Sequence, residues 1–301
     1  MLHRVYPFES DKLMPNESMK ITPEYLDKLI IEFQSRGYEI ISINRLYDIL
    51  TNEEKIDKQI VFTFDDGYKD NYTYAYPVFK KHNISFTVYI TTSLLNRDTI
   101  LWWHALEDLI LENEELVLSG NIRFKCKTFE EKTDTFFKIR KIILSLNTII
   151  SKESLNELFA LYKVDWSAKC EELAMTWDEL IKLSQDNIVT IGSHTNNHFP
   201  LNRLNKEEIL KEIQDSNSII ETHINKKVEH FAYPFGTPET VGKKEILTVK
   251  DLNFKTATTT RNGTVYLEHK KFMYCLPRIM LTEKFKFYDL GRIRKKKIVT
   301  L

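Results

Sequence analysis

The hydrophobic positions of this chain follow two alternating patterns. Short apolar runs with little polar alternation occupy residues 60–64, 85–91 and 188–192, which is typical of strands covered on both faces in a parallel sheet. Elsewhere apolar residues recur at the helical spacing i, i+3, i+4, i+7, as between residues 26 and 33. A repeated alternation of strand and helix predicts a parallel sheet or a barrel.

The pattern predicts about eight strands in all. They cover residues 2–6, 39–43, 60–64, 85–91, 188–192, 230–233, 254–260 and 275–281. One helix is predicted from Thr22 as its N-cap to Gly37, and another begins at Asn205, where Glu208 completes a capping box. An α/β fold with this number of strands suits a seven- or eight-stranded barrel.

The alternation breaks between residues 97 and 186. Amphipathic helices are predicted around Leu106 and after Ser151, but no convincing strand occurs from residue 126 to residue 186. We therefore predict a single barrel domain over residues 1–301 with a mostly helical insertion at residues 97–186, and a small separate subdomain is the alternative.

Composition and charge exclude several classes of protein. Lys plus Arg and Asp plus Glu both total 43, so no overall basic field would attract nucleic acid. The three cysteines are scattered and form no C-x-x-C pair, which predicts reduced thiols in a cytoplasmic protein. The sequence shows neither a charged start followed by a long apolar stretch nor a run of about 18 apolar residues, so we expect no secretory signal and no spanning helix.

The last part of the chain is basic, because residues 292–297 contain Arg292, Arg294 and three consecutive lysines. A solvated tail is the first interpretation. A weak contact with an anionic membrane surface, at the inner face of the membrane, is the alternative.

Two adjacent carboxylates, Asp65 and Asp66, end the apolar run 60–64 within the sequence TFDDG. Burial of two unpaired like charges would raise at least one pKa, so we expect a cation beside them. Gly67 permits a sharp turn that would present both side chains to one cleft. An ordinary strand-ending turn is the alternative interpretation.

Two histidines follow another apolar run. His194 and His198 lie in the sequence SHTNNH after residues 188–192, where one helical turn or a tight loop would bring both imidazoles to one side. With one aspartate they would form an open Asp/His/His site of the kind found in catalytic zinc centres. Ordinary hydrogen-bonded core imidazoles are the alternative.

The motifs TFDDG, SHTNNH and YPFG (residues 233–236), in this order, resemble those of the polysaccharide deacetylase family, also called the NodB-homology or carbohydrate esterase 4 family. The resemblance extends from LHRV near the start of the chain to LPRI at residues 276–279. It implies a distorted (β/α) barrel and the metal-dependent hydrolysis of an N-acetyl group from an amino sugar.

The resemblance also implies roles for individual residues. Asp66, His194 and His198 would be the ligands of one divalent metal ion, and Asp65 would be the general base. Zinc suits this ligand set, although cobalt, nickel or iron would also bind it. The peptide N–H of Phe235 would act as the family's oxyanion donor.

The chain departs from the family pattern at the third motif. The family usually has an arginine two positions before the proline of this motif, where this chain has Ala232. We expect Arg278 to supply the missing cation to Asp65 from another strand end. A surface or barrel-end salt bridge is the alternative role for Arg278.

A second departure concerns the general acid. The family usually places it on a late Leu-x-His motif, but no histidine follows Arg278. We take His3 as its substitute, with a structural histidine as the alternative. His104 and His230 are weaker candidates.

Aromatic residues near the motifs are candidates for substrate contact. Trp103 is expected to stack on the apolar face of a sugar ring, with anchoring of the insertion to the barrel as the alternative. Tyr68 and Tyr233 are expected to border the substrate.

The leading functional hypothesis is therefore a hydrolase that removes an N-acetyl group from an amino sugar, within an oligosaccharide or a carrier-linked glycan. An amidase that acts on another small amide is one alternative. A non-catalytic sugar-binding relative is the other, because Ala232 and the missing late histidine depart from the family pattern. The sequence does not predict the sugar, the carrier or the oligomeric state.

Overall fold

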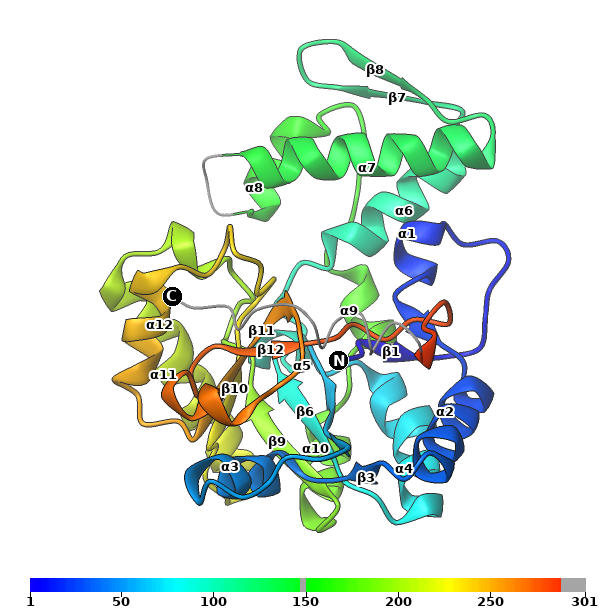
Figure 1. Cartoon of the computed structure of the whole chain (residues 1–301). Helices are drawn as coiled ribbons and strands as arrows, with labels where there is room; N and C mark the ends of the chain where they lie inside the picture. The colour runs from blue at the N-terminus through cyan, green and yellow to red at the C-terminus, as the bar shows by residue number, and fades with distance from the viewer. Residues whose placement is uncertain (147–149, 288–301) are drawn as a thin grey trace.

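The centre of the computed structural model, which describes residues 1–146 and 150–287, is a curled sheet of six parallel strands (Figure 1). Its order is β12-β11-β10-β9-β6-β5. The strands are β5 (Phe62–Phe64), β6 (Phe86–Ile90), β9 (Val189–Ser193), β10 (His230–Ala232), β11 (Thr256–Asn262) and β12 (Leu276–Arg278). Most of their residues are buried on both faces of the sheet, which explains why they read as nearly continuous apolar runs.

The predicted number of seven or eight strands is wrong for this sheet. The first two predicted strands lie instead in two-stranded sheets, where β1 (Arg4–Val5) pairs with β2 (Lys20–Ile21) and β3 (Glu39–Ile40) pairs with β4 (Gln59–Ile60). Leu2, just before β1, adds a single parallel bridge to Phe64 of β5. Hydrophobic periodicity identifies a strand but not its partner, which depends on the curl of the whole sheet. The result is a half-barrel whose edge strands are β5 and β12.

Helices surround the sheet, and their predicted starting signals are confirmed. Thr22 Oγ1 accepts a hydrogen bond from Tyr25 N at 3.2 Å, and Asn205 and Glu208 form the predicted reciprocal capping box. The helical elements outside residues 97–173 are α1 (Met14–Glu17), α2 (Pro23–Ser35), α3 (Ile43–Thr51), η1 (Asn71–Ala75), α4 (Tyr76–His82), α5 (Thr92–Leu95), α10 (Trp177–Gln185), η2 (Leu201–Arg203), α11 (Lys206–Ile224), α12 (Lys243–Lys250) and η3 (Leu267–Lys271).

Residues 102–166 form a second hydrophobic cluster, distinct from that of the sheet. Its elements are α6 (Trp102–Glu112), β7 (Glu115–Leu118), β8 (Ile122–Lys125), α7 (Phe129–Ser145) and α8 (Lys152–Leu158). Figure 1 shows α7, α8 and the antiparallel hairpin β7–β8 projecting at the top, away from the sheet. The next helix, α9 (Ala168–Leu173), already packs on the main core through Cys170. The division of the chain into a 1–301 barrel and a 97–186 insertion stays a prediction.

The predictions about cellular location rest on the expected absence of a spanning helix and on the basic stretch at the end of the sequence. No helix among the described residues is long and apolar enough to cross a membrane. The basic stretch at residues 292–297 lies outside the described residues. The predicted cytoplasmic location and the membrane contact of this stretch therefore stay predictions.

A buried histidine at the start of β10 links folding to pH. His230 is 1% exposed, and its Nδ1 and Nε2 lie 2.8 Å from Thr256 Oγ1 and 3.1 Å from Asn44 Oδ1. Burial, and then the nearby Lys255, lower the pKa of His230 to about 3. Because the folded protein then binds fewer protons than the unfolded chain, the stability that His230 provides is present above about pH 6.5 and is lost as the pH falls toward 3.

We expect His230→Gln to reduce the pH dependence of the unfolding free energy by about 1 kcal/mol per pH unit between about pH 6 and pH 4. Denaturant titrations at several pH values measure this slope. His223→Gln replaces an exposed histidine on α11 and should leave the slope as it is in the wild type. Equal slopes in the wild type and in His230→Gln would contradict the assignment.

Candidate active site and metal centre

The two motif loops meet at the carboxyl ends of strands in one sheet. Asp65 and Asp66 directly follow β5, and His194 directly follows β9, with only β6 between these strands. Because parallel strands end at the same side of the sheet, their loops converge there. Asp66 and His198 have left-handed backbone conformations, with φ of +78° and +58°, which non-glycine residues adopt rarely.

Asp66, His194 and His198 form a compact group whose ligand atoms all lie within 4.8 Å of one another. The Nε2 atoms of His194 and His198 lie 3.5 and 3.4 Å from Asp66 Oδ1, a buried atom with no hydrogen-bond partner among the described residues. His194 Nδ1 donates to the carbonyl oxygen of Ala232 at 2.7 Å, so its Nε2 presents a lone pair to the group.

The charges of this group suit a divalent metal ion. Burial and the neighbouring Asp65 carboxylate raise the pKa of Asp66 to about 8, which reflects a carboxylate short of compensating positive charge. Burial also lowers the pKa values of His194 and His198, so both imidazoles are neutral. Two neutral imidazoles and a carboxylate, all with lone pairs directed at one point, are a donor set that fits such an ion.

The structure places Arg278 on Asp65, as the sequence predicted. Arg278 Nη1 and Nη2 donate to the two carboxylate oxygens of Asp65 at 2.6 and 2.7 Å, and both residues are buried. Burial alone would raise the pKa of Asp65, but Arg278, and to a smaller degree His194, hold it below its usual range. Arg278 is itself fixed by Thr259 O at 2.9 Å and Thr63 Oγ1 at 3.2 Å. The ion pair thus joins β5 to β12, the two edges of the half-barrel.

We expect Arg278→Met to lower kcat on the order of 10–100-fold while metal content stays unchanged, because a charge-assisted contact of roughly 1.5–3 kcal/mol is lost. In an Asp65→Asn background the same substitution should cost little more, since the two residues act as one unit. Steady-state kinetics of the four proteins, together with metal analysis, measure both effects.

Arg261→Met is the matched control for Arg278, because Arg261 lies on β11 and donates to Val241 O instead of to a carboxylate. The thermal stability of each variant separates lost orientation from lost folding, since an unpaired buried Asp65 also destabilises the protein. Equal, independent losses in the wild-type and Asp65→Asn backgrounds would mean that Arg278 serves the fold or the substrate.

His3 lies close enough to Asp65, Arg278 and His194 to be electrostatically coupled to all three. Its Nδ1 is buried and has no hydrogen-bond partner among the described residues. Burial lowers the pKa of His3 to about 4, although Asp65 opposes this shift. The imidazole is therefore neutral near pH 7 and would have to receive a proton before it could donate one.

Phe235 lies at the rim of the metal group, with its ring centroid 5.0 Å from that of His198. Its backbone has a φ of +60°, and its carbonyl oxygen accepts from Thr260 Oγ1 at 2.7 Å. Among the described residues no acceptor pairs with its peptide N–H. The N–H is therefore available as the oxyanion donor that the resemblance implied.

A cavity of about 320 Å³, here called the Trp103 cavity, lies beside the metal group. It is lined by Trp103, His198, Phe199 and Phe235 and, from the insertion side, by Ile150 to Glu153. The Trp103 ring centroid is 6.1 Å from that of His198, whereas Trp102 is only 4% exposed and belongs to the core of the insertion. Trp102 also lines this cavity, but of the two neighbouring tryptophans only Trp103 has a ring contact with a histidine of the metal group.

The two tyrosines expected at the substrate are both buried. Tyr68 is 3% exposed, and its hydroxyl accepts a hydrogen bond from Trp103 Nε1 at 3.2 Å, which helps to hold the indole of Trp103 in place. Tyr233 has no exposed surface, and its hydroxyl donates to Tyr274 O at 2.9 Å. The expectation that Tyr233 contacts substrate is therefore wrong, because its ring packs on Phe231 within the core.

One residue that positions the site was not predicted. Glu212 on α11 accepts hydrogen bonds from Asn197 N at 2.8 Å and Asn197 Nδ2 at 2.6 Å, and its carbonyl oxygen accepts from Asn196 N. These contacts fix the loop between His194 and His198. The only signal in the sequence was a glutamate on a helix that also carries several others, so no pattern distinguished it.

A family model described as polysaccharide deacetylase matches residues 52–257, which is more than half of the chain and includes both motif loops. The chain belongs to the polysaccharide deacetylase family. The matched region ends before Arg278, so the ion pair to Asp65 comes from a part of the chain that the family model does not cover.

Similar proteins agree with this family. The Bacillus subtilis (strain 168) protein YxkH, named as a polysaccharide deacetylase, is 31% identical over 74 residues, which is 24% of this chain and 26% of that protein. The match thus spans about a quarter of YxkH.

Solved structures of deacetylases share the fold over nearly the whole chain. The Streptococcus pyogenes deacetylase PplD, solved in complex with acetate, superposes with a TM-score of 0.64 at 18% identity over 98% of this chain and 96% of its own. A de-N-acetylase from Aggregatibacter actinomycetemcomitans gives a TM-score of 0.60 at 16% identity over 97% of both chains. These likenesses establish the polysaccharide deacetylase fold and agree with the predicted α/β class, with a six-stranded half-barrel in place of the predicted seven- or eight-stranded barrel.

Proposed function

We propose that this deacetylase uses one divalent metal ion, zinc in the first instance, to remove an N-acetyl group from an amino sugar of an oligosaccharide or a carrier-linked glycan. The observation that carries the proposal is the Asp65–Arg278 ion pair beside the group of Asp66, His194 and His198. A base held by a cation next to a metal centre is an arrangement that suits metal-assisted amide hydrolysis.

Each residue has a separate task in this proposal. Asp65, oriented by Arg278, takes the proton of the attacking water. Asp66, His194 and His198 would hold the metal ion, which would supply Lewis-acid polarisation of the acetyl carbonyl and lower the pKa of water. The N–H of Phe235 donates a hydrogen bond to the carbonyl oxygen as negative charge develops on it.

The leaving amine also needs a proton. We assign its delivery to His3, whose neutral imidazole would accept from Asp65 the proton that was removed from water and pass it to the amine nitrogen. The buried Nδ1 of His3 has no hydrogen-bond partner among the described residues, so this nitrogen is available for proton transfer. Trp103 would carry the apolar face of the sugar ring in the Trp103 cavity.

The proposal is tested by acetate release from N-acetylated amino sugars, nucleotide-linked sugars and oligosaccharides, each with zinc, cobalt, nickel or iron(II) added. We expect release with at least one acetylated carbohydrate, and none from Asp65→Asn on the same substrate. Ring opening of cyclic amides without acetate release would instead indicate an amidase. Binding of acetylated sugars without any hydrolysis would indicate the non-catalytic relative.

A further inference from the structure

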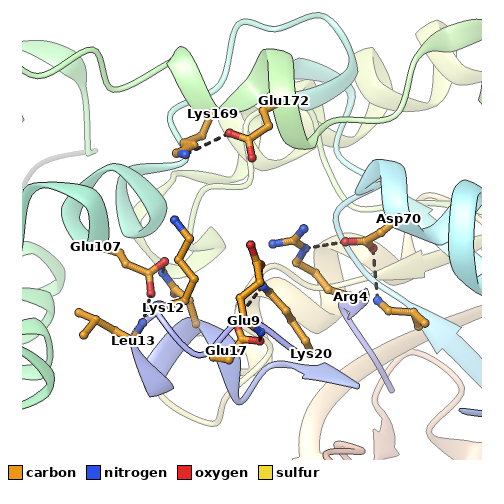
Figure 2. A network of polar contacts seen from close by, with 12 residues as sticks. Arg4, Glu9, Lys12, Leu13, Glu17, Lys20, Asp70, Glu107, Lys169 and Glu172 are labelled. Atoms are coloured by element: carbon orange, nitrogen blue, oxygen red, sulfur yellow. Dashed lines mark hydrogen bonds and ion pairs between the residues drawn. The ribbon is translucent and has the colours of Figure 1, made fainter. Parts of the chain in front are cut away.

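A second cavity of about 290 Å³, here called the Arg4 cavity, shares no lining residue with the Trp103 cavity and is lined by Arg4, whose guanidinium lies over the ring of Tyr68. It is enclosed by the N-terminal segment, α6, α9 and the start of η1, and its lining is almost entirely charged or polar. Figure 2 shows the network of ion pairs and hydrogen bonds around it. No step of the proposed deacetylation uses this cavity.

The carboxylates that line the Arg4 cavity all have partners. Glu9 pairs with Lys20, Asp70 with Arg4, Asp108 and Glu172 with Lys169, and Glu107 accepts hydrogen bonds from Leu13 N and Asn16 Nδ2. Each of these carboxylates is therefore already paired with a positive charge or with N–H donors. The uncommitted hydrogen-bond donors of the cavity belong to its cations.

Arg4 provides two of these donor atoms, Nη1 and Nη2. The residue is only 7% exposed, and its Nε pairs with Asp70 Oδ2 at 2.6 Å. Its terminal nitrogens, Nη1 and Nη2, contact no acceptor among the described residues. The guanidinium is held over the rings of Tyr6 and Tyr68, at 5.5 and 5.1 Å from their centroids. In Figure 2 the two terminal nitrogens point away from Asp70, toward the side on which Lys12 lies.

Two lysines add further donors. Lys12 forms only a long ion pair, with its Nζ 3.6 Å from Asp108 Oδ1, and the side chain of Lys69 forms no hydrogen bond or ion pair with any described residue. These cations also act on His104, which lines the same cavity. Burial, and then Arg4, Lys20, Lys169 and Lys12, lower the pKa of His104 well below its usual value.

We propose that the Arg4 cavity binds the phosphate group of a phosphorylated ligand. The free edge of the Arg4 guanidinium can donate two parallel hydrogen bonds to one phosphate, and Lys12 and Lys69 can reach its remaining oxygens. A carboxylate has only two oxygens and would leave the lysines without an acceptor, which favours phosphate as the ligand.

Tyr68 connects this site to the catalytic one. Its ring lies against the Arg4 guanidinium, and its hydroxyl accepts from Trp103 Nε1. The phosphate therefore has two chemical sources. It is carried either by the substrate itself, as in a carrier-linked sugar, or by a separate small phosphorylated molecule. The binding site does not depend on the proposed deacetylase activity, because phosphate binding is measured without turnover.

The test is calorimetric titration of the full chain with inorganic phosphate. We expect saturable binding with a Kd of about 1 mM or tighter. The double variant Lys12→Gln, Lys69→Gln should weaken it about tenfold or more, since two charge-assisted contacts are lost. Lys163→Gln, at an exposed lysine outside both cavities, should bind as the wild type does.

Arg4→Lys keeps the positive charge beside Asp70 but removes the planar guanidinium with its two parallel donors, so it should also weaken phosphate binding. Circular dichroism should show that the variant stays folded. Absence of saturable phosphate binding by the wild type would overturn the proposal. Equal affinity in the wild type and in Lys12→Gln, Lys69→Gln would overturn it as well.

A second measurement distinguishes the two sources. If the substrate carries the phosphate, Lys12→Gln should raise KM for a phosphorylated acetylated sugar and leave KM for its unphosphorylated form unchanged. If a separate molecule carries it, inorganic phosphate should bind without competing with either sugar. Both results support a phosphate site at Arg4, whereas inactivity on every sugar would count against the proposed function alone.

Discussion

Asp65→Asn is expected to lower the turnover of deacetylation by on the order of 10²–10⁴-fold, which is the usual contribution of a general base. The carboxamide cannot take the proton of the attacking water at neutral pH. Metal content should not fall, because Asp65 belongs to the ion pair with Arg278 and not to the group of Asp66, His194 and His198. Initial rates of acetate release and elemental analysis of the same samples measure the two quantities.

Asp57→Asn is the matched control for Asp65→Asn, because Asp57 is an exposed carboxylate shortly before the same strand. It should retain full turnover. The stability of Asp65→Asn must be measured in parallel, since the substitution leaves the buried Arg278 without its counter-charge. Near-normal turnover in a folded Asp65→Asn protein would rule out Asp65 as the base.

His198→Ala is expected to remove most of the bound metal and to lower turnover by on the order of 10³-fold, corresponding to about 4 kcal/mol of lost Lewis-acid stabilisation. The substitution leaves one imidazole and one carboxylate, which is too few ligands for a stable zinc site. Elemental analysis should find one metal ion per wild-type chain and little in the variant.

His223→Ala serves as the control, because His223 is an exposed histidine that stacks on Trp177 far along α11 from the metal loop. Removal of metal from the wild type with a chelator should reproduce the loss seen in His198→Ala, and added zinc should restore activity only in the wild type. A His198→Ala protein that keeps full metal stoichiometry would refute the assignment of this ligand.

Local patterns were enough to predict most elements. The capping signals at Thr22 and Asn205 and the apolar runs that became β5, β6 and β9 depend on residues within a few positions of one another. The number of strands in the sheet depends on pairing between distant segments. The segments at residues 2–6 and 39–43 have the expected pattern but are not strands of the six-stranded sheet, to which Leu2 adds only a single bridge at Phe64.

The grouping of Asp66, His194 and His198 was predictable from the sequence. Each follows an apolar run, and the ends of parallel strands meet at one side of the sheet. Arg278 was predictable for a different reason. Two adjacent carboxylates need a cation, and this chain has Ala232 where the resemblance to the family places an arginine.

Only the tertiary structure decided which side chains face the cavities. Tyr233 lies in a recognisable motif, yet its side chain packs on Phe231 in the core, while Trp103 and not Trp102 has a ring contact with a histidine of the metal group. The anchor at Glu212 and the unpaired edge of Arg4 likewise arise from residues far apart in the sequence. The sequence by itself determined where chemical groups occur at strand ends, because that depends on local backbone pattern. Whether such a side chain lies in a cavity or in the core depends on packing between distant segments, and no local pattern contains that information.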